Sequence, residues 1–217
     1  MKITKLTTQE RNVERVNMFL DGRFACGISL NTVAKYNIFV GKELSDGEYR
    51  DILYNDLGER LFNRAVDYLG NSLKTAKQIK VYLRNLLFKK KGDWYDELEK
   101  EEREELVQST MDKLQEYSYL NDGEFAEAFI SSRMKNKPRG KSILLGELLA
   151  KGVSKEIAEE KLEEMIDDEY DMLKRVYEKK YGEEKFGMRD KKKIDFLLRK
   201  GFNWDLIERY INEKSEK

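Results

Sequence analysis

Histidine is absent from the sequence, and cysteine and proline each occur once in 217 residues. Without histidine there is no serine–histidine triad, no histidine-ligated zinc or iron site and no imidazole proton shuttle. The single cysteine, Cys26, excludes an intramolecular disulfide and any cysteine cluster that could hold a metal. Because proline interrupts helices and only Pro138 is present, the composition favours a largely α-helical protein.

Long apolar runs are also missing. No stretch approaches the roughly 18 residues that a membrane helix requires, and the first residues lack the apolar core of a signal peptide. We therefore expect a cytoplasmic protein with no membrane partner. Charged residues make up 39% of the chain, yet 42 positive and 42 negative residues leave a net charge of zero. The electrostatic surface that a partner contacts therefore depends on how the charges are distributed along the chain.

Nothing in the sequence indicates a catalytic site. Carboxylates are numerous, but they lie in charge-rich stretches, whereas a catalytic carboxyl needs burial or a close partner to shift its pKa. Gly140-Lys141-Ser142 is not a phosphate loop, because a Walker A motif needs glycine where Lys135 stands and a strand before it. We predict no catalytic residues, no metal, no cofactor and no small-molecule substrate.

The first part of the chain has the pattern of a β-hairpin. Residues 14–20 and 23–28 are rich in residues that favour strands, and Asp21-Gly22 stands between them. Asp-Gly at such a place predicts a type I′ turn, whose two central residues need positive φ. Ser45, just before two acidic residues, is expected to cap a helix. We assign residues 1–56 to an N-terminal β-hairpin segment with a connecting helix.

Two stretches in the second half of the chain resemble each other. Residues 148–162 (LLAKGVSKEIAEEKL) align without gaps on 197–211 (LLRKGFNWDLIERYI), and the same positions are apolar in both stretches. Each stretch has a glycine that suits the left-handed end of a helix, followed by a residue that caps the next helix. The glycines are Gly152 and Gly201, and the caps are Ser154 and Asn203. Each stretch therefore predicts a tight helical hairpin.

A third, more divergent copy precedes these two. Thr75 to Gln78 has the spacing of a capping box, and apolar residues on either side follow helical stripes. The stripe residues are Ala65, Tyr68, Leu69, Ile79, Leu83, Leu86, Leu106, Met111 and Leu114. A charged insertion, residues 88–103, separates the second and third helices. The prediction is a mainly α fold of three-helix repeats at 57–118, 119–168 and 169–217, stacked in an elongated array.

Aromatic residues are mostly expected in the core. Four of them stand at helical spacing among aliphatic residues and are predicted to pack inside: Tyr68, Phe125, Phe129 and Trp204. Cys26, within a predicted strand, is expected to be a small buried residue. Trp94 and Tyr95 lie within the charged insertion and are either an anchor for it or a contact with a partner.

Positive charge gathers in each repeat. Residues 74–92, 133–141 and 185–193 are basic runs, and 93–105 and 155–171 are acidic. One such run is typical of a solvated helix face, but its recurrence predicts a basic stripe facing an acidic or phosphate-bearing partner. The candidate contacts are Lys77, Lys80, Arg84, Arg133, Lys137, Arg139, Lys141, Lys191, Lys192 and Lys193.

Several of these motifs together resemble the RecX family of RecA regulators. They are residues 114–126 (LQEYSYLNDGEFA), Arg133, Arg139-Gly140-Lys141 and residues 147–153 (ELLAKGV). Ala65, Tyr68 and Leu69 match the opening of the family's first unit, and the Asp-Gly hairpin resembles its N-terminal extension. Lys74 and Gln78 depart from the arginine-rich entry and the glutamate that are usual in the first unit, and residues 88–103 are a longer insertion than the family norm.

The resemblance implies a regulator without enzymatic activity. Members bind the RecA–single-stranded DNA filament, hinder its growth or promote its disassembly, and suppress recombination and the coprotease activity of the SOS response. Two other functions stay open from the residues alone. One is a stand-alone nucleic-acid-binding protein that contacts DNA directly, and the other is a passive scaffold for protein interactions.

Overall fold

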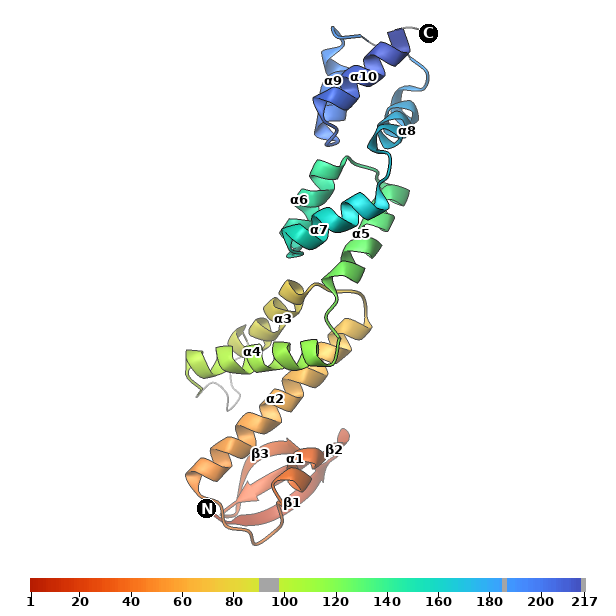
Figure 1. The fold of residues 1–217 in the computed structure, drawn as a ribbon. Helices are drawn as coiled ribbons and strands as arrows, with labels where there is room; N and C mark the ends of the chain where they lie inside the picture. Colours follow the sequence, from red (N-terminus) through yellow and green to blue (C-terminus); the bar gives the residue numbers. More distant parts are fainter. Residues whose placement is uncertain (90–97, 185–186, 216–217) are drawn as a thin grey trace. The chain divides into compact units, whose positions relative to one another are not determined.

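The structure is a computed structural model that describes residues 1–89, 98–184 and 187–215, so Trp94 and Tyr95 lie outside the described residues. The described chain has three strands and ten helices (Figure 1). They are β1 Ile3–Gln9, β2 Asn12–Leu20, β3 Arg23–Ser29, α1 Leu30–Lys35, α2 Asp46–Gly70, α3 Ala76–Lys89, α4 Lys100–Glu116, α5 Asp122–Asn136, α6 Lys141–Lys151, α7 Lys155–Met165, α8 Glu169–Tyr181, α9 Lys191–Arg199 and α10 Trp204–Ser215.

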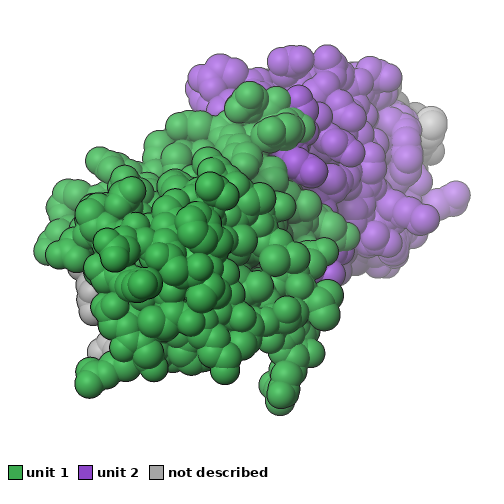
Figure 2. Space-filling view, turned by 90° about the horizontal axis from the view of Figure 1, so that it is seen from below, with its two compact units in different colours: residues 1–70, 83–117 green, residues 71–82, 118–217 purple. Residues whose placement is uncertain are grey.

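The chain divides into two compact units (Figure 2). Unit 1 comprises residues 1–70 and 83–117, and unit 2 comprises residues 71–82 and 118–217. Unit 1 therefore holds the sheet, α1, α2 and α4, and unit 2 holds α5 to α10. Helix α3 contributes its first half to unit 2 and its second half to unit 1.

The N-terminal sheet is antiparallel with strand order β1-β2-β3. The predicted turn between β2 and β3 is confirmed, because Asp21 and Gly22 both have positive φ, 49° and 83°. The predicted hairpin accounts for β2 and β3, and β1 adds a third strand along the other side of β2. Cys26 is buried, as expected, among the apolar side chains of the sheet and the first turns of α2.

Helix α2 connects the sheet to the helical part of unit 1. Ser45 caps it as predicted: its Oγ accepts the Glu48 N–H at 3.2 Å, and Glu48 Oε2 accepts the Ser45 N–H at 2.8 Å. The helix then runs without a break to Gly70. The expected boundary between residues 56 and 57 thus falls inside one helix, because neither Gly58 nor any neighbouring residue ends it.

A buried carboxylate ties the sheet to α2. Asp56 is 1% exposed, and its Oδ2 accepts Arg15 Nη2 at 2.8 Å. Its Oδ1 accepts the Ser29 N–H at 2.7 Å and the Thr32 hydroxyl at 3.1 Å. Buried charges are stable only when they are paired and hydrogen-bonded, and Asp56 satisfies both conditions. One side chain on α2 therefore holds β2, the end of β3 and α1.

The first three-helix module has the capping that the sequence predicts. Most of the predicted apolar stripe is buried, but Tyr68, Leu69 and Leu86 are only half-buried, and Leu87 lies in the core next to Leu86. Thr75 Oγ1 accepts the Gln78 N–H at 3.2 Å, and Gln78 Oε1 accepts the Thr75 N–H at 3.0 Å. Helix α3 extends to Lys89, and α4 begins at Lys100, so both ends of the predicted insertion at 88–103 are helical. Leu106, Met111 and Leu114 of α4 are buried, and α4 packs against α2.

Unit 2 confirms the predicted helix ends. Gly152 and Gly201 have φ of 97° and 91°, the left-handed conformation expected after a helix. The side chain of Ser154 accepts the Ile157 N–H at 3.3 Å, and that of Asn203 accepts the Leu206 N–H at 2.9 Å. The two aligned stretches, 148–162 and 197–211, therefore form the same helix–turn–helix hairpin.

The second and third modules share one hydrophobic core, which extends from Phe125 on α5 to Ile211 on α10. Phe125 is buried and Phe129 packs against this core, as predicted. The prediction for Trp204 is wrong, because its side chain is 44% exposed. Trp204 is the first residue of α10, and the buried stripe of that helix begins one turn later at Ile207.

Candidate partner-binding surface

The candidate residues are positioned by a junction that recurs between modules. The backbone N–H of Ala76, which begins α3, donates to Asp122 Oδ1 at 2.8 Å. The N–H of Lys141, which begins α6, donates in the same way to Glu169 Oε1 at 2.8 Å. Asp122 and Glu169 are the first residues of α5 and α8, so the first helix of one module caps the second helix of the module before it.

The same junction contacts the end of the following second helix. Thr75 Oγ1 donates to Lys151 O at 2.7 Å, and the Gly140 N–H donates to Lys200 O at 2.8 Å. The turn glycines lie directly against these contacts. A Cβ on Gly152 would come within 2.4 Å of the Lys77 side chain, and one on Gly201 within 2.8 Å of Ile143. The glycines thus allow both the left-handed turn and the close approach of two modules.

The second helix of every module has an unusual N-terminal charge. Acidic residues occupy the first turn of α2, α4, α5, α7, α8 and α10, as the positive end of a helix favours. Helices α3, α6 and α9 have no acidic residue there. Their first turns carry lysines instead, namely Lys77, Lys141 and Lys191 to Lys193. Cations at this end oppose the helix dipole, so these positions are costly for the helix and suited to an anion.

In the first module the candidates follow α3. Lys77, Lys80 and Arg84 are spaced by one helical turn each and therefore share a face of the helix. Lys77 is exposed, and its stem covers Gly152. Arg84 donates from Nε and Nη2 to Glu104 Oε2 at 3.0 and 2.8 Å, and the side chains are 50% and 32% exposed.

In the second module one acid holds two candidates. Glu147 of α6 accepts Arg133 Nε at 2.7 Å and lies 3.6 Å from Arg139 Nη1. The Arg133 guanidinium also lies over the Phe129 ring, 4.8 Å from its centre. Lys141 pairs with Glu163 at 2.8 Å. These side chains are partly exposed, and ion pairs in contact with solvent contribute about 1 kcal/mol each, so a partner's carboxylates or phosphates can replace them.

In the third module the three lysines of α9 differ from one another. Lys191 and Lys192 are exposed. Lys193 is 17% exposed, its ammonium pairs with Glu184 at 2.9 Å, and it lies 5.5 Å from the centre of the Tyr181 ring. The hydrogen bond to Glu184 raises the pKa of Lys193 in spite of desolvation. Lys193 therefore belongs to the packing of its own module.

The structure thus separates the ten candidates into two groups. Exposed lysines that form no ion pair with any residue in the described ranges are Lys77, Lys137, Lys191 and Lys192. Those that pair within the molecule are Arg84, Arg133, Arg139, Lys141 and Lys193, and Lys80 is half-buried. The lysines of the first group can contact a partner directly. Most residues of the second group can do so only by giving up their ion pair within the molecule for one with the partner.

Three acids organise this surface, and none of them is marked by a pattern of its own in the sequence. Glu147 was not singled out, although it joins two candidate arginines of its module. Asp122 and Glu169 stand at helix starts, where acids are common for a local reason, so their longer-range role had no distinct pattern. A signal was nevertheless present: the three second helices carry lysine in the first turn and have no acidic residue there.

In residues 1–89, 98–184 and 187–215, no group of three or more cysteine, aspartate or glutamate side chains is arranged to hold a metal ion. Over the same ranges, no helix combines the length and the apolar character needed to cross a membrane.

Comparisons with known proteins agree with the fold. Three family models match this chain: the regulatory protein RecX N-terminal domain over residues 1–45, the RecX second three-helix domain over 121–162 and the RecX third three-helix domain over 167–211. The chain is 32% identical to a regulatory protein RecX of Bacillus pumilus, covering 97% of this chain and 76% of the relative. It is 30% identical to that of Bacillus subtilis with the same coverage.

Two solved structures have a similar fold. A crystal structure of regulatory protein RecX matches with a TM-score of 0.73 over 98% of both chains, at 21% identity. A crystal structure of RecX from Lactobacillus salivarius matches with a TM-score of 0.57, over 74% of this chain and 97% of that one, at 24% identity. Because both structures are less than 25% identical to this chain, these matches establish similarity of fold and nothing further.

Proposed function

Because the chain belongs to the RecX family of regulatory proteins, we propose that it binds the RecA–single-stranded DNA filament and inhibits its recombinase and coprotease activities. It acts by hindering filament growth or promoting disassembly, and it catalyses no reaction itself. The observation that carries this proposal is the recurring start of α3, α6 and α9, where lysines stand in place of the usual acids.

The junctions suggest how the third module contacts its partner. At α3 and α6 a carboxylate from the following module accepts the first backbone N–H. At α9 the N-cap residue Asp190 makes no side-chain hydrogen bond to its helix, and it accepts the Gly187 N–H instead. The first backbone N–H of α9, that of Lys191, donates to Arg189 O at 3.0 Å. A carboxylate of RecA is therefore bound at α9 by the side-chain ammonium groups of Lys191 and Lys192.

Several modest contacts are sufficient for such a partner. Each exposed lysine contributes little alone, because surface ion pairs are screened by salt and cost side-chain entropy. Contacts held by one protein on a repetitive filament strengthen each other, since the first contact raises the effective concentration of the next. Inhibition should therefore weaken by steps as modules lose charge.

The test reverses the two available lysines of α9 and keeps Lys193, whose packing role would confuse the result. We expect Lys191→Glu with Lys192→Glu to raise the concentration for half-maximal inhibition of RecA-driven ATP hydrolysis about tenfold, equivalent to about 1.4 kcal/mol. The physical reason is that two attractive contacts with an acidic surface become repulsive. Hydrolysis is measured on single-stranded DNA at fixed salt.

The matched control changes the same charge in the same module away from this site. Lys179→Glu with Arg199→Glu alters two exposed cations of α8 and α9 and should leave inhibition within about twofold of the unmodified protein. Circular dichroism must show equal helix content in all three proteins. Equal inhibition by both double variants would remove Lys191 and Lys192 from the binding surface.

A further inference from the structure

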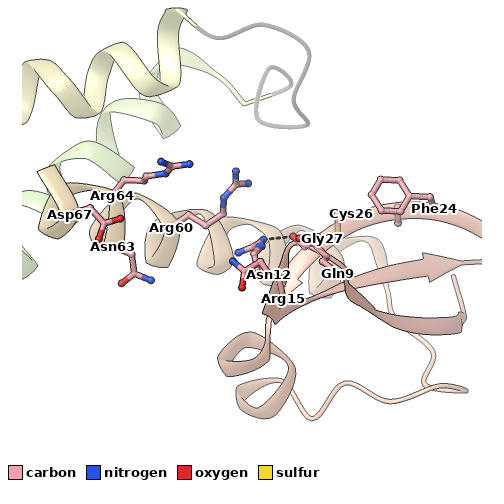
Figure 3. Close-up of a pocket in the computed structure, with 11 residues that line it drawn as sticks. Gln9, Asn12, Arg15, Phe24, Cys26, Gly27, Arg60, Asn63, Arg64 and Asp67 are labelled. Carbon is pink, nitrogen blue, oxygen red and sulfur yellow. Dashed lines mark hydrogen bonds between the residues drawn. The ribbon is translucent and has the colours of Figure 1, made fainter.

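The N-terminal unit contains a pocket that none of the candidate residues lines. It has a volume of about 670 Å³ and lies between the sheet and the second half of α2, entirely within unit 1 (Figure 3). The strands and their turn contribute Gln9, Asn12, Arg15, Phe24, Ala25, Cys26 and Gly27, and the helix contributes Arg60, Asn63, Arg64 and Asp67. Arginine, side-chain amide and an exposed aromatic ring therefore meet at one opening.

The charge of the pocket comes mainly from the helix. Arg15 is already neutralised, because it pairs with Asp56 and donates to the carbonyl of Gly27. Arg60 and Arg64 are one turn apart, about 6 Å along α2, and Figure 3 shows their guanidinium groups extending to the same side of the helix. Neither forms an ion pair with any residue in the described part of the chain. Among the described residues that line the pocket, Asp67 is the one acid, so the wall keeps positive charge.

The sheet side of the pocket carries an aromatic ring in solvent. Phe24 is 61% exposed, and its ring meets Phe19 edge to face with centroids 5.8 Å apart. This contact fixes the ring and leaves its remaining surface uncovered. Beside it, Gln9 is held by a 2.8 Å hydrogen bond from its Nε2 to Asn17 Oδ1. Its carbonyl oxygen is a potential acceptor, as is the amide oxygen of Asn63, whereas Asn12 Oδ1 already accepts the Glu14 N–H at 3.1 Å.

We propose that this pocket binds single-stranded nucleic acid, with Arg60 and Arg64 contacting backbone phosphates and Phe24 stacking on a base. Guanidinium groups suit phosphate oxygens, aromatic faces accept any base, and amides hydrogen-bond to base edges. An acidic protein segment would use the arginines but would leave the ring and the amides without a role. The inference goes beyond the proposed function, because it assigns a direct contact with the strand to the N-terminal unit and needs no RecA.

The experiment measures binding of the full chain to a fluorescein-labelled oligothymidylate of about 20 nucleotides by anisotropy, across a salt series and without RecA. We expect Arg60→Gln with Arg64→Gln to weaken binding about tenfold or more and to reduce the slope of log affinity against log salt by about 1.4, the value for two phosphate contacts on a single strand. Phe24→Ala should weaken binding about fivefold or more with an unchanged slope, because stacking releases no counterions.

The matched control removes two cations from the same unit outside the pocket. Lys5→Gln with Arg23→Gln changes exposed strand residues and should leave both the affinity and the slope nearly unchanged. An oligonucleotide with 5-iodouracil should also cross-link to Phe24 under ultraviolet light, as mapped by mass spectrometry. This readout uses the unmodified protein, so it stands even where a variant is unstable.

Three results would overturn the inference. The first is an unchanged affinity and slope for the arginine double variant, and the second is an equal loss in the control. The third is unchanged oligonucleotide binding together with weaker binding to RecA filaments, which would assign the pocket to an acidic protein surface. Because the anisotropy assay contains no RecA, its outcome is independent of the test of inhibition described above.

Discussion

Alanine in place of Gly140 should lower the free energy of unfolding of unit 2 by about 3 kcal/mol. A Cβ at Gly140 would lie 2.2 Å from the carbonyl oxygen and 2.4 Å from the carbonyl carbon of Gly201, and backbone atoms have no rotamer by which to move aside. Overpacking of this kind costs about 1–3 kcal/mol. Separation of the two modules would also break the bonds from Gly140 N–H to Lys200 and from Ser142 to Gly201, at about 1 kcal/mol each.

The control for this prediction lies on the same helix. Gly146 has nothing within 4 Å of its Cβ position and lies in the interior of α6. Gly146→Ala should therefore stabilise unit 2 by about 0.5–1 kcal/mol, since glycine costs conformational entropy in a helix. Urea unfolding followed by circular dichroism measures both variants. If Gly140→Ala left the free energy of unfolding unchanged or raised it as Gly146→Ala does, the close approach of the second and third modules at Gly140 would not be a constraint on folding.

Features set by local chemistry were predictable from the sequence. The Asp21-Gly22 turn and the helix end at Gly152 follow from φ preferences, because few residues tolerate positive φ. The caps at Ser45, Thr75 and Ser154 follow from the needs of the first N–H groups of a helix. Each of these rules involves residues within four positions of each other, so a single sequence is sufficient to apply them.

Features set by distant partners were not predictable. Strand β1 has only loose alternation of apolar residues, and its place depends on pairing with β2 through the tertiary fold. The continuity of α2 through residues 56 and 57 reflects burial of successive turns against different partners, first the sheet and then α4. No local sequence pattern shows at which turn of α2 packing against the sheet gives way to packing against α4.

The sequence predicted which residues give the candidate surface its charge, but not which of them are exposed and which are paired within the molecule. The basic runs indicated which residues carry charge, and the structure shows that Glu147 holds Arg133 and Arg139 while Lys191 and Lys192 remain exposed. Long side chains on separate helices reach each other by rotamer choices that sequence spacing does not encode. For the same reason the pocket beside Arg60 and Arg64 had no sequence signal, since its two walls are separate elements.

Alanine at Asp56 should destabilise unit 1 by about 3–5 kcal/mol, the cost of breaking a buried ion pair from one side. It removes the acceptor for Arg15, for the Ser29 N–H and for the Thr32 hydroxyl, and these donors have little access to water. Asp56→Asn should cost less, because an amide oxygen still accepts from Ser29 while the Arg15 charge is left unpaired. Asp51→Ala, on an exposed turn of the same helix, should change stability by less than about 0.5 kcal/mol.

Cys26 provides a reporter specific to this unit. It is the single cysteine, it is 3% exposed, and burial raises the pKa of its thiol to about 11, so the folded state is protected from thiol reagents at pH 8. The rate of labelling by dithionitrobenzoate then measures opening of the sheet. It should rise at least a hundredfold in Asp56→Ala at reagent concentrations where closing is faster than labelling, because the rate then follows the population of the open state. Adding Arg15→Met should restore part of the protection, because the second change removes the unpaired charge. Labelling that is equally slow in the single and double variants would show that the sheet is held on α2 by its apolar contacts alone.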